Sequence, residues 1–294
     1  MRARFGLVFA GLMLGLIMAG AAAAAPPAFG PVGTQAGPLR EEAWLVPSPV
    51  ANLAMRATLY RPKGDGPFPL AVLNHGSEES GAARRKLGDP RFPAITAWLV
   101  GRGYAVLLPQ RPGHGATGGP YIETQGRCGA PDYVAAGQRT ADSIEAALGF
   151  MFEQDFVKRS GALVIGNSAG GWGAVALAAR NPAGVSAIVS FAGGRGGRDR
   201  NRPNHNCAPD RLIGAAAAFG ATARTPTLWL YAENDSYFAP DLSRALAAAF
   251  SAAGGRVDYE LLPSIQGDGH ALMLEDGKGA AWRAPLARFL KQTK

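Results

Sequence analysis

The sequence is poor in the residues that bind metal ions. It has two cysteines and four histidines in 294 residues, and they are not grouped at the spacing of a metal site. The sequence therefore gives no indication of a metal site. The net charge of +8 could favour anions, but the sequence has no nucleic-acid motif and no basic stripe interleaved with aromatic residues. We do not expect nucleic acid as a partner.

Long hydrophobic runs are also absent, except at the N-terminus. Arg2 and Arg4 precede an apolar run over residues 5–18, and small residues follow at 21–25. This pattern predicts a secretory signal peptide over residues 1–25. The alternative is an uncleaved membrane anchor, but the run is short for a membrane span. We expect a mature protein that is secreted or periplasmic and not bound to a membrane.

Internal repeats and interdomain linkers are lacking as well. Residues 26–41 are rich in proline and glycine and are predicted to form an extended leader. Residues 42–294 suit one α/β domain with a sizeable core.

Short apolar segments alternate with helical segments along this domain. The expected strands are 42–46, 53–60, 70–74, 104–108, 162–165, 185–191, 227–231 and 257–262. The expected helices are 92–103, 135–153, 174–180, 212–219, 240–253 and 279–291. The alternation predicts a mostly parallel sheet of about eight strands with helices on both faces.

Polar residues with catalytic chemistry follow several of the expected strands. They are His75, His114, Ser168, Asp235 and His270. Ligands of parallel sheets bind at the carboxyl ends of the strands. These side chains are therefore expected to converge on one edge of the sheet.

The segment around Ser168 has the strongest pattern. Gly166 and Gly170 flank Ser168 as Gly-x-Ser-x-Gly, between the strand over 162–165 and the helix over 174–180. A serine on such a sharp strand-to-helix turn has a strained backbone and an exposed hydroxyl, and the glycines leave space where a Cβ would clash. The alternative is that Ser168 only caps the helix.

A nucleophilic serine needs a histidine as base and a carboxylate that orients the histidine. His270 follows the candidate acids in a glycine-rich loop. Asp235 comes soon after a strand and is preferred as the acid. Asp241 falls in the first turn of a helix, where acids are common, and Asp268 is expected to shape the turn before His270. The expected triad is Ser168, Asp235 and His270.

Acyl transfer also needs hydrogen-bond donors for the developing oxyanion. The N–H of Ala169 is one candidate. Ser77, in the loop after the strand over 70–74, is the second, with Glu78 as its alternative.

Substrate contacts are expected from His75, Glu78 and Trp172. For His75 the alternative is a structural role in its turn. A structural role is also the preferred interpretation of His114.

Five segments resemble, in order, the α/β-hydrolase superfamily and in particular its dienelactone-hydrolase-like branch. They are 73–77, 103–115, 166–170, 233–235 and 269–270, and the resemblance covers roughly residues 42–292. It implies the α/β-hydrolase fold over residues 42–294, with neither a metal nor an organic cofactor. Dienelactone hydrolases proper use a cysteine nucleophile and are usually cytosolic. With Ser168 in that position and an expected signal peptide, the resemblance implies a serine carboxylesterase acting on a small-molecule ester.

Two other functions stay open at this point. A peptidase or amidase would use the same triad. A hydrolase-fold binding protein would lack catalysis, and the intact set of Ser168, Asp235 and His270 argues against it.

Two loops, over residues 116–132 and 193–209, are expected to cover the pocket. They contain the only cysteines, Cys128 and Cys207. In an oxidising compartment these are predicted to form a disulfide, the alternative being two free buried thiols. The second loop also has four arginines, which either form a solvated flexible loop or bind an acidic group of the substrate. They are Arg195, Arg198, Arg200 and Arg202.

Overall fold

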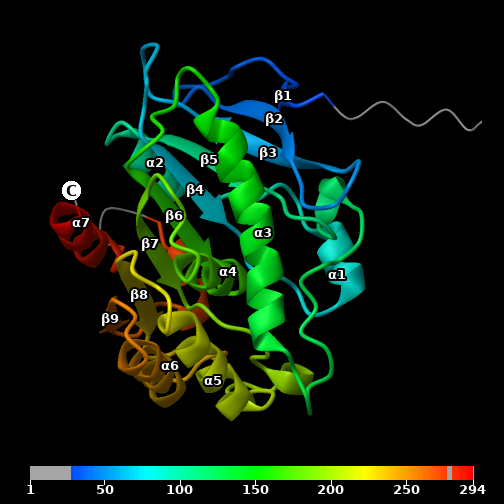
Figure 1. The fold of residues 1–294 in the computed structure, drawn as a ribbon, viewed down its shortest axis with the longest axis vertical. Coiled ribbons are helices and arrows are strands. Elements are labelled where there is room, and N and C mark those ends of the chain that lie inside the picture. The colour runs from blue at the N-terminus through cyan, green and yellow to red at the C-terminus, as the bar shows by residue number, and fades with distance from the viewer. Residues whose placement is uncertain (1–27, 277–279, 294) are drawn as a thin grey trace, which may run out of the picture.

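The structure is a computed structural model, and it describes residues 28–276 and 280–293. A nine-stranded sheet in the order β1-β2-β3-β5-β4-β6-β7-β8-β9 runs through the molecule (Figure 1). The strands are β1 (Gly30–Pro31), β2 (Glu42–Pro47), β3 (Ala54–Tyr60), β4 (Leu70–Asn74), β5 (Ala105–Pro109), β6 (Ala162–Asn167), β7 (Val185–Phe191), β8 (Thr227–Ala232) and β9 (Val257–Leu262). The helices are α1 (Gly81–Lys86), α2 (Pro93–Val100), α3 (Tyr133–Phe152), α4 (Ala169–Ala178), α5 (Pro209–Gly220), α6 (Pro240–Ala252) and α7 (Arg283–Gln292). Short 3₁₀ helices are η1 (Gly115–Thr117), η2 (Asp199–Asn201) and η3 (Gly269–Leu274).

The sheet is antiparallel on one side and parallel across the rest. β1, β2, β3 and β5 pair antiparallel in turn, whereas β5, β4 and β6 to β9 are joined by parallel pairs. Burial alternates along β2 but is complete along β4 and β5, as in strands covered on both faces. This is the mostly parallel sheet expected from the sequence. The additional strand, β1, forms within the expected leader over residues 26–41.

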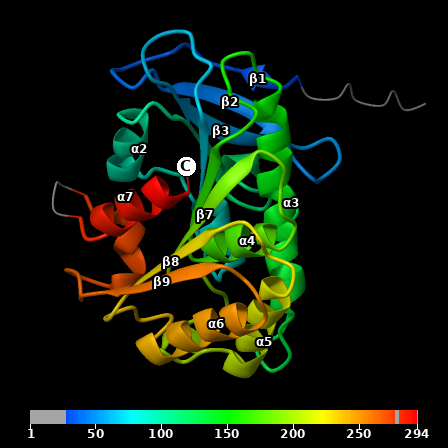
Figure 2. The ribbon, with the colours of Figure 1, turned by 60° about the vertical axis from the view of Figure 1, so that its left-hand side comes forward.

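Helices cover both faces of the sheet (Figures 1 and 2). One apolar cluster packs α3, α4, α5 and α6 against one face, and a second packs α2, α7 and η3 against the other. Connections between parallel strands therefore cross over either face, and the loops that follow the strands gather at the carboxyl edge of the sheet.

The helix after Ser168 begins earlier than the sequence predicts. It was expected over 174–180, but α4 covers Ala169–Ala178. Glycine has low helix propensity, so the glycines of the first turns conceal the start of this helix. They are needed for close packing, because a Cβ on Gly173 would lie 2.2 Å from Cγ2 of Thr140 on α3.

The sequence gives no signal for α1. This helix buries none of its residues, so it has no apolar periodicity, and its N-cap is the side chain of Ser80. The last helix, expected over 279–291, begins at Arg283.

No helix within residues 28–276 and 280–293 is long and apolar enough to cross a membrane. The signal peptide expected over residues 1–25 lies outside the described residues.

A disulfide joins Cys128 to Cys207, as the sequence predicts, with Cα atoms 4.8 Å apart. Cys207 is buried, its N–H donates to the carbonyl of Gly196 at 2.8 Å, and its own carbonyl accepts the hydroxyl of Tyr133. The bond therefore ties the loops over 116–132 and 193–209 to each other and to the start of α3.

We predict that this disulfide stabilises the fold. The bridged cysteines are 79 residues apart, so the chain-entropy model gives an upper figure of about 4–5 kcal/mol for the double variant Cys128→Ser/Cys207→Ser. Urea unfolding with and without a thiol reductant measures the effect. Reductant should lower the unfolding free energy of the wild type and leave the double variant unchanged. A wild type that is equally stable in both buffers would contradict the prediction.

Candidate active site

Ser168 lies on a sharp turn between β6 and α4. Its backbone has φ 54° and ψ −120°, a conformation that residues other than glycine rarely adopt. A Cβ on Gly166 would lie 2.3 Å from backbone atoms of Gly170, and a Cβ on Gly170 would lie 2.4 Å from the carbonyl oxygen of Asn74. The Ser168 side chain makes no capping hydrogen bond. Ser168 is the N-cap residue of α4, but the alternative that its hydroxyl caps this helix is wrong.

The N-terminus of α4 lies directly behind this serine. Ala169 is the first residue of the helix, and the N–H groups of a first turn have no acceptor within their own helix. These groups, together with the helix dipole, favour negative charge beside Ser168.

Asp235 and His270 lie within hydrogen-bond distance of each other. Nδ1 of His270 is 3.2 Å from Oδ1 and 3.3 Å from Oδ2 of Asp235, which is 2% exposed. Oδ1 also accepts the N–H groups of Tyr237 at 2.7 Å and Phe238 at 3.0 Å. The carboxylate is thus fixed by the backbone and faces one side of the imidazole ring.

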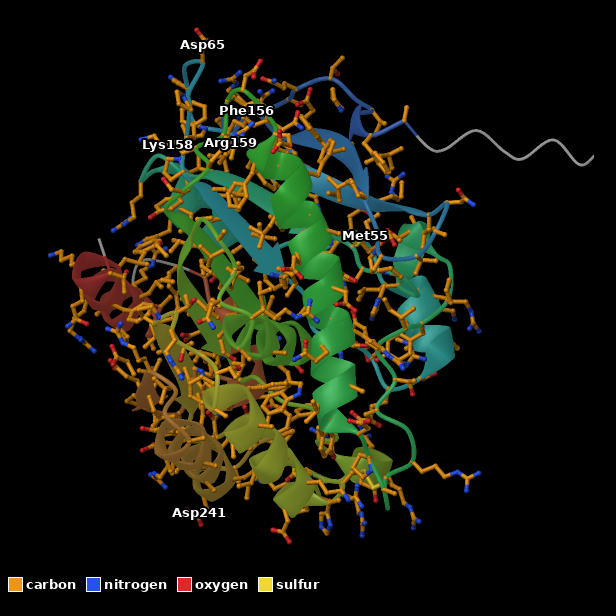
Figure 3. All side chains as sticks on the ribbon, viewed as in Figure 1. Met55, Asp65, Phe156, Lys158, Arg159 and Asp241 are labelled. Atoms are coloured by element: carbon orange, nitrogen blue, oxygen red, sulfur yellow. A yellow bond between two sulfur atoms is a disulfide. The ribbon has the colours of Figure 1, made fainter. Side chains whose placement is uncertain are left out.

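The two other candidate acids lie in different settings. Asp268 accepts the N–H of His270, the N–H of Ser236 and the Ser236 hydroxyl, and therefore shapes the turn before the histidine. Burial would raise the pKa of Asp268, but these hydrogen bonds outweigh it and lower the pKa. Asp241 points outward from α6 into solvent and pairs with Arg244 (Figure 3).

Tyr237 is a site residue that the sequence analysis missed. Its ring stacks on the His270 imidazole with centroids 4.0 Å apart and planes inclined by 23°. Arg198 lies over the same tyrosine at 5.4 Å from the ring centroid. Such a stack restricts the orientation of the imidazole ring. Nothing in the local sequence distinguishes this tyrosine from other aromatic residues.

Two clefts meet at Ser168. The first cleft, of about 320 Å³, is bordered by Ala169, Tyr121, Arg195 and the disulfide. The second cleft, of about 610 Å³, is bordered by His270, His75, Phe92 and Leu274. The residues common to both are Ser77, Glu78, Glu79, Ser168 and Tyr237.

Ser168 and His270 both line the second cleft, but no hydrogen bond joins their side chains among the described residues. Catalytic hydrogen bonds are often long before substrate binds. The structure therefore brings Ser168, Asp235 and His270 to one edge of the sheet, with the His270 imidazole oriented by the Asp235 carboxylate.

A directional chain of hydrogen bonds holds Ser77. Nη1 of Arg195 donates to the Tyr121 hydroxyl at 2.9 Å, and this hydroxyl lies 3.3 Å from Oγ of Ser77. Oγ in turn lies 2.9 Å from Nε2 of His114, whose Nδ1 faces the carbonyls of Arg111 and Pro112. Carbonyls can only accept, so Nδ1 of His114 carries the ring proton and Nε2 accepts from the Ser77 hydroxyl. Ser77 has then used its proton, so the Tyr121 hydroxyl accepts from Arg195 and donates to Ser77. Burial lowers the pKa of His114 to about 4, which keeps this acceptor neutral.

His75 uses both ring nitrogens on the backbone. Nε2 accepts the N–H of Arg111 at 3.1 Å, and Nδ1 donates to the carbonyl of Gly76 at 2.5 Å. Burial, followed by the charge of Arg111, holds the pKa of His75 well below its usual range. His75 borders the second cleft but has no free nitrogen for a substrate, and this supports its structural alternative.

Trp172 does not lie where the sequence analysis expected it. Its side chain is 1% exposed, packs on Phe219 and donates its indole N–H to the carbonyl of Tyr133 at 2.9 Å. It lines neither cleft. The turn of α4 directs this ring into the core, so the expected substrate contact is wrong. Glu78, by contrast, borders both clefts.

A buried carboxylate joins two buried arginines below the first cleft. Glu123 accepts Nε of Arg111 at 2.5 Å and Nη2 of Arg195 at 2.7 Å. Glu123 and Arg111 are fully buried and Arg195 is 6% exposed. Burial alone would raise the pKa of Glu123, but the two guanidinium groups outweigh it and hold this pKa well below its usual range.

Arg195 therefore does not belong to a solvated loop, which corrects one of the sequence-based alternatives. Arg198 is partly buried and donates to the Ser236 hydroxyl at 2.8 Å. Only Arg200 and Arg202 are exposed, each within 4 Å of the Asp199 carboxylate.

One group of metal-type ligands occurs within residues 28–276 and 280–293, formed by Cys128, Asp199 and Cys207. Both cysteine sulfurs are in the disulfide, which leaves a single carboxylate, so this group does not suit a metal ion.

The sheet order and the strand-to-helix turn define the α/β-hydrolase fold. Solved structures with this fold include an acetyl xylan esterase from a Paenibacillus species, at 15% identity and TM-score 0.62 over 91% of this chain and 88% of that one. A putative dienelactone hydrolase from Klebsiella pneumoniae subsp. pneumoniae matches at 18% identity and TM-score 0.57, over 86% and 98%. Dipeptidyl peptidase 4 from Porphyromonas gingivalis matches at 14% identity and TM-score 0.61, over 87% of this chain but only 36% of the peptidase. At these identities the likeness concerns the fold.

The family profile described as the dienelactone hydrolase family matches residues 87–285, more than half of the chain. The chain therefore belongs to the dienelactone hydrolase family and is an enzyme of the hydrolase kind. No curated protein sequence matches it.

We predict that Glu123→Gln destabilises the protein by about 3–5 kcal/mol at neutral pH, because it leaves two buried guanidinium groups without a counter-charge. The lowered pKa of Glu123 means that its contribution is fully present above the unfolded pKa, near 4.3, and is lost as the pH falls towards the folded pKa. The stability difference between wild type and variant should therefore shrink in acid.

Chemical denaturation of both proteins between neutral pH and pH of about 3 measures this difference. Glu153→Gln is the matched control, since the Glu153–Arg159 pair is exposed at 3.0 Å and should contribute less than about 1 kcal/mol. Equal losses of unfolding free energy in the two variants would show that the buried ion pairs of Glu123 stabilise the protein no more than an exposed pair does.

Proposed function

We propose that the protein is a serine hydrolase that cleaves carboxylic esters through an acyl-enzyme. The observation that carries this proposal is the strained turn at Ser168, which lies at the same sheet edge as the oriented Asp235–His270 pair. A binding protein without catalysis would need neither the strain nor the pairing.

In the proposed reaction, His270 accepts the proton of Ser168 as Oγ attacks the ester carbonyl. Asp235 fixes the tautomer of His270 and stabilises its cation. The N–H groups of Ala169 and Ser77 bind the oxyanion. His270 then gives its proton to the leaving alcohol, and water hydrolyses the acyl-enzyme by the same steps in reverse order.

A peptidase or amidase is the second candidate. Structures of similar fold include dipeptidyl peptidase 4 and an acylaminoacyl peptidase from Pyrococcus horikoshii, although this chain spans only 36% and 41% of their lengths. Matched ester and amide panels on the purified protein distinguish the two activities.

We also propose that the protein works outside the cytoplasm, secreted or periplasmic. The Cys128–Cys207 disulfide supports this location, because such bonds persist in oxidising compartments. The expected signal peptide supplies the route of export.

We predict that Ser168→Ala lowers ester turnover by several orders of magnitude, leaving only the rate due to binding and the oxyanion donors. Because the Ser168 side chain makes no capping hydrogen bond, the variant should not show the loss of about 1 kcal/mol that follows removal of a helix cap. A fluorophosphonate probe should label the wild type once, and this labelling should be lost in Ser168→Ala.

Ser251→Ala, an exposed position on α6, is the control and should keep both activity and labelling. A folded wild type that takes up no probe and hydrolyses no short-chain ester would refute the enzyme proposal.

We predict that Asp235→Asn lowers kcat by roughly 10⁴, as in serine proteases where the carboxylate fixes the histidine tautomer. Asp241→Asn, at a fully solvent-exposed side chain, should have no effect. Asp268→Asn should lose far less than Asp235→Asn, because Asp268 only shapes the turn. Steady-state ester hydrolysis compares the three variants. If Asp235→Asn kept a kcat close to that of the wild type while Asp268→Asn was inactive, Asp268 would be the carboxylate that orients His270.

A further inference from the structure

The two clefts that meet at Ser168 contain different parts of the proposed machinery. Ala169, the proposed oxyanion donor, lines the first cleft and not the second. His270, the proposed base, lines the second cleft and not the first. Each cleft is therefore suited to a different half of an ester.

The chemistry of acyl transfer fixes which half goes where. Oγ of Ser168 forms a bond to the carbonyl carbon as its proton passes to His270. The bond between this carbon and the alcohol oxygen then breaks, and the His270 proton passes to that oxygen. The alcohol must therefore lie beside His270, in the second cleft. The acyl chain extends away from His270, into the first cleft. This assignment rests on the proposed function.

Arg195, which borders the first cleft, has one donor without a partner among the described residues. Arg195 is 6% exposed, and its Nε is buried without a hydrogen-bond partner among the described residues. The other guanidinium nitrogens donate to Glu123, Thr140 and Tyr121. A buried donor without a partner costs about 1–3 kcal/mol, so a ligand oxygen that accepts from Nε would relieve this cost.

The charges around the first cleft favour a neutral acceptor over an anion. Three carboxylates border this cleft, those of Glu78, Glu79 and Asp199, against the two guanidinium groups of Arg84 and Arg195. The positive charge of Arg195 is already shared with Glu123. Burial, followed by the charge of Asp199, raises the pKa of Glu79, as expected where negative charge accumulates. A carboxylate on the acyl chain of the substrate would be repelled by these negative charges, whereas a neutral hydroxyl or keto oxygen would not.

The second cleft is larger, at about 610 Å³ against about 320 Å³, and partly apolar. Leu87, Pro90, Phe92 and Leu274 contribute to its wall, and Leu274 is 51% exposed. Its size and apolar surface suit an alcohol bulkier than the acyl chain.

We propose that the first cleft is the acyl site, for a short chain with a neutral oxygen acceptor that binds Arg195, and that the second cleft holds a bulkier alcohol. The substrates are thus esters of small hydroxy or keto acids.

Three ethyl esters with acyl groups of nearly equal shape test the acyl site. Ethyl β-hydroxybutyrate should exceed ethyl isovalerate in kcat/KM by about tenfold or more, since a hydrogen bond to a charged group is worth at least this factor. Monoethyl malonate, the anionic analogue, should not exceed the hydroxy ester. In Arg195→Lys, which keeps the charge but lacks Nε, the ratio of hydroxy ester to isovalerate should fall towards one.

Two exposed positions test the division between the clefts without touching the catalytic groups. Thr124 borders the first cleft and not the second, and Leu274 the second and not the first. Leu274→Trp should lower the ratio of benzyl to ethyl β-hydroxybutyrate hydrolysis and leave the ratio of ethyl β-hydroxybutyrate to ethyl acetate unchanged. Thr124→Trp should leave the ratio of benzyl to ethyl β-hydroxybutyrate hydrolysis unchanged and lower the ratio of ethyl β-hydroxybutyrate to ethyl acetate. Each variant is therefore the control for the other.

Several results would overturn the proposal while the hydrolase function stands. These are equal rates for the hydroxy ester and isovalerate, a preference for the malonate, or crossed effects of the two tryptophan variants. Labelling of Ser168 by the fluorophosphonate probe without turnover of any of these esters would also overturn it. Failure of both labelling and turnover would instead refute the proposed function, and the acyl-site assignment with it.

Discussion

The close contact between the start of α4 and the end of β4 is the constraint on which the site depends. A Cβ at Gly170 would lie 2.4 Å from the carbonyl oxygen of Asn74 and 2.5 Å from that of His75. Because Gly170 has no side chain, the backbone of α4 packs against the backbone at the end of β4. Ser168 is thereby raised above the sheet edge, and Gly76 comes to lie beside it, where a Cβ would be 3.3 Å from that of Ser168. The position of the hydroxyl relative to the loop after β4 follows from this one approach.

The buried charges hold the other side of the site. Arg111 follows β5 and Arg195 follows β7, and both bind the carboxylate of Glu123. Removing these charges from water is costly, so the three loops must keep their arrangement to satisfy them. The hydrogen bonds from Arg195 through Tyr121 to Ser77 restrain the loop beside Ser168 as well. Rigid loops of this kind hold donors in place before the substrate arrives.

The sequence predicted those features that depend on local pattern. The strands over 70–74, 185–191 and 257–262 agree with the structure residue for residue. The first two are short, largely buried apolar runs, and the third is an edge strand in which apolar residues alternate with Asp258 and Glu260. The positions of Ser168, Asp235 and His270, each after a strand of the parallel sheet, predicted that they lie close together. A parallel sheet requires this once its strands are placed.

Features that depend on tertiary packing were not predictable in this way. The direction of Trp172 is set by its neighbours, since Gly137 on α3 leaves space for the indole, with an added Cβ 3.1 Å from Trp172 Cδ1. The pairing of Arg195 with Glu123 joins residues 72 apart in the chain, and no local pattern indicates it. The stack of Tyr237 on His270 similarly joins the loop after β8 to η3. Composition alone suggested a solvated loop where the fold buries an arginine.

Tyr237 borders both clefts and stacks on His270, and this position has a consequence for how the enzyme could diverge. A change at Tyr237 would alter the shape of both clefts and the surroundings of His270 in a single step. Thr124 and Leu274 each border one cleft, so mutations there alter one half of the site at a time. Such independence lets selection explore new acids while keeping an alcohol, or new alcohols while keeping an acid. New substrate specificities would then arise through changes in the exposed loops. Tyr237, which both clefts share, would be the position least tolerant of substitution.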